Sequence, residues 1–133
     1  MITESECMEY VLKVCPGYAS DWQKHLEGWE GEEVELFIHT ASFAQYAVKY
    51  IESDDEQELK MIANAIEYLH GEGDDGVRQA IEMGFLETLI GHCNHNPKKH
   101  PVRRFTQFFK GSCLDISRAM SESWEKSSDE GGI

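Results

Sequence analysis

The side chains best suited to metal chemistry lie within nine residues of one another in the second half of the chain. They are His92, Cys93, His95 and His100, all of them groups that Zn²⁺ or Ni²⁺ accepts as ligands. Adjacent positions on a helix point about 100° apart, so His92 and Cys93 cannot both face one ion, and two lysines directly before His100 oppose a cation. We therefore expect no metal site, with solvated histidines and a packed cysteine instead.

Patterns typical of other catalytic sites are missing from the sequence. It contains no GxSxG or HExxH motif and no glycine-rich phosphate loop after a strand. The acidic run around Asp74 lacks the alternating ligands and the distant glutamate of a calcium loop. The four cysteines, Cys7, Cys15, Cys93 and Cys113, have no CxxC spacing and are expected to be inert packing groups. The sequence predicts a protein that is not an enzyme and needs no cofactor.

Charge is distributed unevenly along the chain, whose formal net charge is −13. Residues 1–97 hold 20 acidic and 5 basic side chains, and residues 98–133 hold 5 acidic and 7 basic ones. An acidic body repels nucleic acid and anionic membranes and accelerates encounter with a basic protein. The local basic patch includes Lys98, Lys99, Arg103, Arg104 and Lys110; we expect it to pair with neighbouring acidic helices while the phenylalanines within it fill the core.

The N-terminal residues MITESECMEY carry acids where a signal peptide has a basic and then an apolar run. The apolar stretches fall far short of the ~20 residues that span a bilayer. We expect a cytoplasmic protein with reduced thiols that does not bind membranes.

Apolar residues recur at helical intervals throughout the first two thirds of the chain. Thr3 and Glu6 have the spacing of a capping box and predict a helix over residues 4–14. Ser20 and Gln23 repeat that spacing before a second helix, which is expected to bury Trp22 and Trp29 in the core.

Two longer helices follow in the prediction. A central helix over residues 32–51 has its apolar positions on one face: Val34, Phe37, Ile38, Ala41, Ala44, Val48 and Ile51. Ser53 and Glu56 form a third predicted capping box, before a helix with the stripe Leu59, Ile62, Ala63, Ile66 and Leu69.

The stretch from Asp74 to Cys93 predicts two short helices joined at Gly84, which is expected to end the first in the left-handed conformation. After Pro101 the pattern allows one helix or two up to about Lys126, with Gly111 as a possible break. We predict an all-α fold of six to seven helices in irregular antiparallel hairpins, with α-solenoid (armadillo/HEAT-like) character. Residues 1–126 form one domain in this prediction, and residues 127–133 form a flexible tail.

Part of the chain, residues 34–93, resembles a family of small acidic all-helical bacterial proteins of the toxin-immunity type. That family has a helix with small residues and a Phe-Ala pair, an apolar-Glu-apolar helix, a short acidic turn and a "VR…GFLE.L" signature. The matching residues here are Phe43-Ala44, Ile66-Glu67-Tyr68-Leu69, Asp74-Asp75, Val77-Arg78 and Gly84-Phe85-Leu86-Glu87 with Leu89. The resemblance implies a helical fold and carries over no catalytic residue.

Small size, acidity, a surface-presenting helical fold and the missing catalytic motifs together favour a non-catalytic binding module. Its most specific form is an immunity protein that occludes a basic toxin domain, such as a nuclease, with carboxylates that mimic phosphates. The predicted partner-binding residues form three acidic clusters: Glu27, Glu30, Glu32, Glu33 and Glu35; Asp54, Asp55, Glu56 and Glu58; and Glu72, Asp74 and Asp75. The alternatives are a helical adaptor or regulatory protein without a toxin partner and, less favoured, a metal-dependent enzyme that uses His92–His100. Homo-oligomerisation is left open.

Overall fold

The computed structural model describes the backbone of residues 1–131 and the side chains of residues 1–123, and this part of the chain consists of helices joined by turns and loops. The helices are α1 (Glu4–Val14), α2 (Ala19–Gly28), α3 (Leu36–Ser53), α4 (Glu56–Glu72), α5 (Asp75–Ala80), α6 (Glu87–His95), α7 (Arg103–Thr106) and α8 (Ser112–Gly131). A 3₁₀ turn, Pro16–Tyr18, precedes α2, and a π-helical segment, Ile81–Leu86, joins α5 to α6. The predicted all-α class and number of helices are confirmed, since α5, the π segment and α6 make one continuous helix and bring the total to seven.

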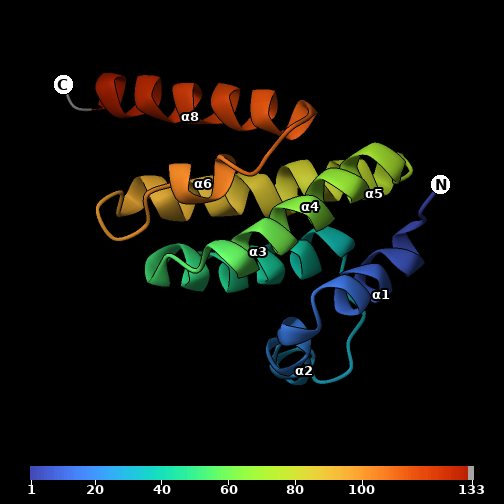
Figure 1. Ribbon diagram of the computed structural model, residues 1–133. Helices are drawn as coiled ribbons and strands as arrows, with labels where there is room; N and C mark the ends of the chain where they lie inside the picture. The colour runs from blue at the N-terminus through green and yellow to red at the C-terminus, as the bar shows by residue number, and fades with distance from the viewer. Residues whose placement is uncertain (132–133) are drawn as a thin grey trace.

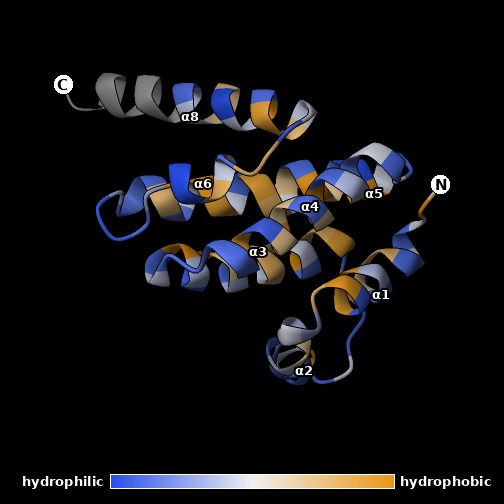
Figure 2. Ribbon diagram, viewed as in Figure 1, coloured by the Kyte–Doolittle hydropathy of each residue, from blue (hydrophilic) through white to orange (hydrophobic). Residues whose placement is uncertain are grey.

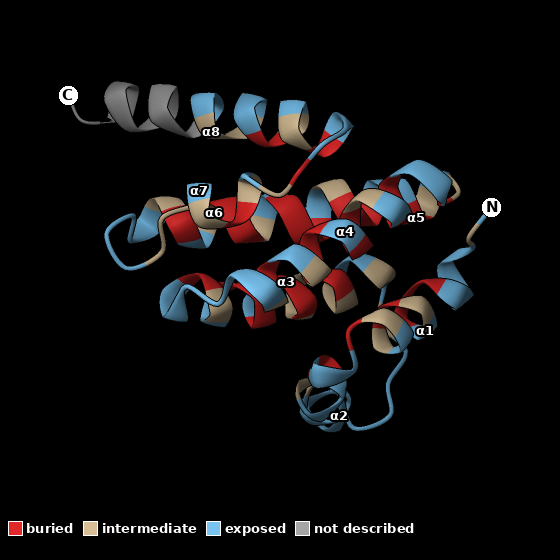
Figure 3. Cartoon of the chain, in the orientation of Figure 1, coloured by how far each residue is buried: buried red, intermediate tan, exposed pale blue. Residues whose placement is uncertain are grey.

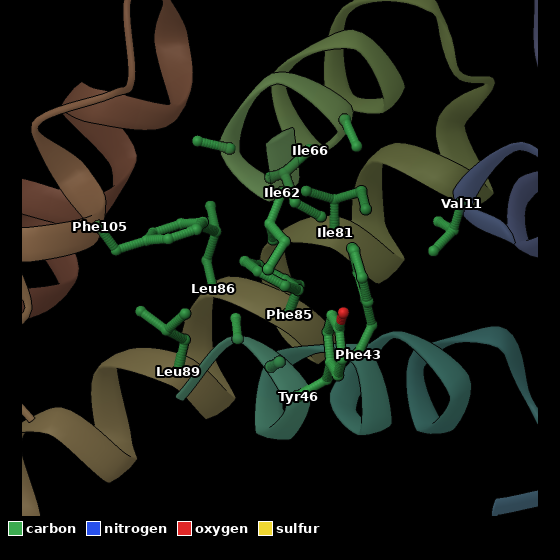
Figure 4. Close-up of a cluster of buried hydrophobic side chains, with 14 of the residues drawn as sticks. Val11, Phe43, Tyr46, Ile62, Ile66, Ile81, Phe85, Leu86, Leu89 and Phe105 are labelled. Carbon is green, nitrogen blue, oxygen red and sulfur yellow. The ribbon is translucent and has the colours of Figure 1, made fainter. Parts of the chain in front are cut away.

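The core lies where α3, α4 and the α5–α6 helix pack together. Figure 1 shows α3 and α4 running in opposite directions, with the α5–α6 helix returning beside them. Buried positions concentrate on the facing sides of these helices in Figure 3, and the apolar residues of Figure 2 follow the same sides. The rings of Phe43, Phe85 and Phe105 connect three elements through centroid distances of 5.6 and 5.8 Å (Figure 4).

Two of the predicted helices match the structure closely. Helix α1 covers residues 4–14 as expected, and the carboxylate of Glu6 accepts hydrogen bonds from the Thr3 backbone N–H at 3.0 Å and from Thr3 Oγ1 at 2.7 Å. In α4 the whole predicted stripe is buried: Leu59, Ile62, Ala63, Ile66 and Leu69. The cap of α4 was predicted wrongly, however, because Ser53 is the last residue of α3 and Asp55 caps α4 instead, accepting from the Glu58 N–H at 3.2 Å.

Helix α3 begins at Leu36, four residues later than predicted. Glu30 and Gly31 adopt positive φ angles of 51° and 80°, which make a turn after α2, and Glu35, the N-cap of α3, has extended backbone with φ −65° and ψ 151°. Ala44, Val48 and Ile51 are buried as predicted, but Phe37 is 43% exposed. Phe37 lies in the first turn of α3, at the end of the helix and outside the core.

The predicted break at Gly84 is wrong. Helical backbone continues from α5 through the π segment into α6, where the Glu87 N–H donates to the Glu82 carbonyl five residues back. Gly84 is needed for close packing rather than for a turn, because a Cβ on Gly84 would lie 2.0 Å from Thr40 Oγ1 and 2.5 Å from the Phe37 carbonyl oxygen. The Thr40 hydroxyl also donates to the Ala80 carbonyl at 2.8 Å, so the same residue of α3 is bound to the end of α5, directly before the π segment.

Helix α2 buries none of its residues, which contradicts the prediction that it places two tryptophans in the core. Trp22 is half-buried, and Trp29, which follows the helix, is 37% exposed. The ring of Tyr18, from the 3₁₀ turn, occupies the core position instead, 5.0 Å from Phe43. In Figure 3, α2 accordingly stands at the edge of the molecule with almost its whole surface exposed.

The C-terminal region, for which the sequence allowed one helix or two, contains α7 and α8 separated by residues 107–111. Phe105 and Phe109 are buried in the core, as expected for the phenylalanines of the basic patch. Helix α8 reaches Gly131, beyond the predicted end near Lys126. The flexible tail over residues 127–133 stays a prediction, and residues 132–133 lie outside the described part of the chain.

Candidate binding surface

The first predicted acidic cluster forms an exposed segment that we call the acidic turn, residues 27–35. Its carboxylates come from the end of α2, from the loop and from the N-cap of α3, and all are exposed: Glu27, Glu30, Glu32, Glu33 and Glu35. None of them forms an ion pair within the part of the chain whose side chains are described. The acidic turn thus presents an uncompensated negative surface.

The second acidic cluster lies at the turn between α3 and α4 and is largely used within the protein. Asp55 caps α4, and Glu58 accepts a hydrogen bond from the Tyr46 hydroxyl at 2.8 Å. Burial, followed by the hydrogen bonds from its neighbours, raises the pKa of that tyrosine far above its usual value. Asp54 takes a left-handed conformation at the end of α3 and lies 3.5 Å from Arg104 Nε, which leaves Glu56 as the freest member.

The third acidic cluster lies at the turn between α4 and α5. Asp74 caps α5 by accepting from the Val77 N–H at 2.9 Å, and its own N–H donates to the Ile2 carbonyl at 2.8 Å. Glu72 and Asp75 are exposed. Asp74 therefore holds the N-terminus against the turn between α4 and α5, and two carboxylates of the cluster remain exposed.

The three clusters do not form one surface. Because α3 and α4 are antiparallel, the second cluster lies at the opposite end of α3 from the acidic turn, a helix length of about 27 Å away. The acidic turn and the third cluster lie at the same end, where Glu35 and Gly76 line one hollow. The structure thus places the acidic turn and the third cluster at one end of α3 and the second cluster at the other end.

A groove of about 1190 Å³ runs along the outer face of α3 beside the acidic turn. Helix α3 forms its floor, α2 one wall, and the π segment with the start of α6 the other wall. Three large apolar side chains lining it are partly open to solvent: Trp29 (37%), Phe37 (43%) and Met83 (52%). The groove could not be predicted from the sequence, because the helical periodicity assigns both Trp29 and Phe37 to the core.

A histidine pair joins α2 to α3 at the edge of the groove. His25 Nε2 and His39 Nδ1 lie 2.9 Å apart, and the Trp22 ring packs against both imidazoles. Burial lowers the pKa of His25, and burial together with the neighbouring His25 lowers the pKa of His39. Neutral imidazoles are therefore favoured, one donating its N–H to the other.

The candidate metal ligands of the sequence analysis do not converge. Cys93 is buried, which raises the pKa of its thiol to about 12, while His92 and His95 are exposed and His100 Nε2 lies 3.1 Å from Glu52 Oε2. No group of three or more His, Cys, Asp or Glu side chains that could hold a metal occurs in the described residues. The other three cysteines are likewise free and buried, and burial raises the pKa of Cys7 to about 12.

The structure also contains a serine-histidine-glutamate chain that the sequence analysis missed. His70 Nδ1 lies 3.1 Å from Ser112 Oγ, and His70 Nε2 lies 3.0 Å from Glu82 Oε2. The backbone N–H groups of Lys110 and Gly111, which directly precede Ser112, both donate to Glu67 and so are not free to stabilise an oxyanion. We interpret these hydrogen bonds between Ser112, His70 and Glu82 as a structural contact that holds α8 against α4 and the π segment.

Residues 8–123 match a family described as a domain of unknown function, DUF7674. The chain belongs to this family. The match spans α2, the acidic turn and all the helices of the core, so the groove lies within the family domain. Searches among curated proteins and among solved structures found no match to the chain. No helix in the described residues has the length and apolar character needed to cross a membrane.

Proposed function

We propose that this DUF7674 protein is a non-catalytic binding module of the toxin-immunity type, which occludes a basic toxin domain in the cytoplasm. One observation carries the proposal: the acidic turn exposes five carboxylates without an ion-pair partner in the described part of the chain. Acidic residues near a helix start often serve the helix alone. Here Glu30, Glu32 and Glu33 precede α3 and lie outside its first turn, so that structural role does not account for them.

The mechanism is electrostatic steering followed by steric occlusion. A toxin groove that attracts phosphates is rich in lysine and arginine, and the acidic turn offers carboxylates at the end of a body whose residues 1–97 carry a net charge of −15 (5 basic minus 20 acidic side chains). Unpaired surface charge accelerates association more than it adds to affinity. Interactions of this kind weaken as the Debye length falls from ~30 Å at 0.01 M salt to ~8 Å at 0.15 M.

The test is binding kinetics against the product of the gene directly upstream, where an immunity protein is expected to have its toxin. Wild type is compared with Glu30→Gln/Glu32→Gln/Glu33→Gln and with a control of equal charge change away from the acidic turn, Glu56→Gln/Asp115→Asn/Glu122→Gln, whose side chains are also exposed. We expect the acidic-turn variant to associate about tenfold more slowly at low salt, and the control to change much less.

The outcomes separate the function from its mechanism. Absence of binding to the upstream product would overturn the immunity function and leave a helical adaptor as the better description. Binding that is insensitive to salt, or equally slowed in both variants, would retain the immunity function and discard the acidic turn as its electrostatic surface.

A further inference from the structure

The groove beside the acidic turn has the dimensions of a helix-binding site. Its floor extends along α3 from Phe37 to Lys49, which corresponds to about 18 Å or three helical turns. Its volume of about 1190 Å³ is larger than the ~300–1,000 Å³ typical of small-molecule pockets. The groove is therefore better matched to a peptide segment than to a metabolite.

Large apolar side chains lie at the end and on the walls of the groove, and small side chains lie along part of its floor. Phe37, Trp29 and Met83 contribute partly exposed apolar surface from the floor and from both walls. Ala41 and Ser42, one turn along α3 from Phe37, are small and allow a partner backbone to approach closely. Grooves with apolar anchors spaced along one helix face are the usual receptors of amphipathic helices.

Charge differs between the two ends of the groove, whose opposite walls also hold one base and one acid, Lys24 and Glu87. At the Phe37 end, the acidic turn leads directly into α3 and carries no ion-pair partner in the described residues. At the other end, the Lys49 ammonium is already neutralised by Asp21 at 2.5 Å. A ligand whose basic residues lie at one end of an apolar face complements this distribution.

We infer that the groove holds an amphipathic helix of the partner protein, with the partner's lysine or arginine residues against the acidic turn. The inference rests on the proposed function and identifies the part of the partner that is recognised. A second copy of the chain is a poor occupant, because it carries the same net charge of −13 and would bring a second acidic turn towards the first.

The experiment uses two fluorescein-labelled peptides of about 14 residues, which is four helical turns. Both have a leucine and alanine face; one carries lysines at one end of its polar face, and the other carries glutamates at the same positions. Fluorescence anisotropy measures their binding to the full chain, and sedimentation velocity records whether the protein is monomeric.

Three variants are compared with wild type. Phe37→Ser/Met83→Ser removes two anchors that are already exposed, so the core stays intact. Tyr68→Ser is the matched control, since this α4 side chain is 47% exposed, packs on Tyr10 at a centroid distance of 4.8 Å and does not line the groove. The Glu30→Gln/Glu32→Gln/Glu33→Gln variant tests the acidic turn. Circular dichroism confirms that each variant is folded.

We expect the lysine peptide to bind wild type and Tyr68→Ser equally, and Phe37→Ser/Met83→Ser about tenfold or more weakly. If peptide binding weakens only in the acidic-turn variant, the groove is not the binding site, and the acidic turn remains the proposed electrostatic surface. If peptide binding weakens only in Phe37→Ser/Met83→Ser, the groove binds a helix, but the inference that the helix is basic is wrong. Equal binding of the glutamate peptide would contradict the basic helix in the same way. The inference would be wrong if neither peptide binds wild type, or if the protein forms a dimer through the groove. The proposed function is decided separately, by the binding kinetics with the upstream product.

Discussion

The helices of the body and helix α2 have similar sequence patterns but very different environments. In the body, the apolar stripes of α3, α4 and the α5–α6 helix are buried against one another (Figure 4). Helix α2 also has apolar residues at helical spacing, yet it buries none of them fully. Only the edge of the core receives Trp22, and polar contacts such as Tyr18–Ser42 at the start of α2 and His25–His39 complete its attachment to α3. Periodicity therefore predicts that a helix forms, but whether its apolar face is buried depends on the neighbours available to it.

The comparison is tested most strongly by removing one aromatic side chain from each region. Phe85→Ala should lower the free energy of unfolding by about 4 kcal/mol, because the ring is fully buried between Phe43 and Phe105 and its removal leaves a cavity. Trp29→Ala should cost less than about 1 kcal/mol, since that ring is already 37% exposed. Urea unfolding monitored by circular dichroism measures both. Equal losses would mean that α2 belongs to the same packed unit as the body.

A second pair of variants adds one methyl group in each region. Gly84→Ala should destabilise by about 3 kcal/mol, because the new Cβ would collide with Thr40 and with the backbone of Phe37. Gly28→Ala, at the end of α2, meets nothing within 4 Å and should stabilise the protein by about 0.5 kcal/mol through a less flexible unfolded chain. The same unfolding measurement serves for both. A neutral Gly84→Ala would show that α3 and the π segment are not in tight contact.

The smallest expected effect concerns the histidine pair that joins the two regions. The pKa of His25 and that of His39 both lie below the ordinary value of 6.5, so the unfolded chain binds protons first as the pH falls. Stability should therefore be fully present above about pH 6.5 and decline as the pH falls from there through the folded-state pKa values, below which the loss levels off.

The measurement is the free energy of unfolding between pH 7.5 and pH 5 for wild type and for His25→Gln/His39→Gln, with the exposed His95→Gln as the control. The double variant should lose less stability over this range than wild type or the control does, because its two glutamines stay neutral. Parallel curves for all three proteins would show that the pair does not couple to folding.

Features encoded locally were predictable from the sequence. The capping box of Thr3 and Glu6 and the buried stripe of α4 need only residues three or four positions apart, and both agree with the structure. The start of α3 was missed because the acidic run before it is also typical of a first helical turn. The extended backbone of Glu35, the N-cap, shows that the helix begins only after this run.

Features that depend on distant partners could not be predicted. A glycine within an apolar helical pattern either ends a helix or admits a close neighbour, and only the contact of Gly84 with α3 distinguishes the two. The candidate site divides in the same way: the exposure of the acidic turn follows from its composition, whereas the groove depends on how α2, α3 and the π segment are placed. The residues Trp29 and Phe37 carried a signal for it only as aromatic side chains next to a dense run of acids.

The π segment also determines which changes of chain length the protein can tolerate. A π-helical turn accommodates one residue more than an α-helical turn, so deleting one residue from Ile81–Leu86 would convert the stretch to regular α-helix while α6 keeps nearly the same face towards the core. Leu89, Ile90 and Cys93 would then stay buried, whereas a deletion within α4, a regular helix, would rotate everything beyond it by about 100°. Members of the family should consequently differ by one residue between Asp74 and Cys93 more readily than within α4.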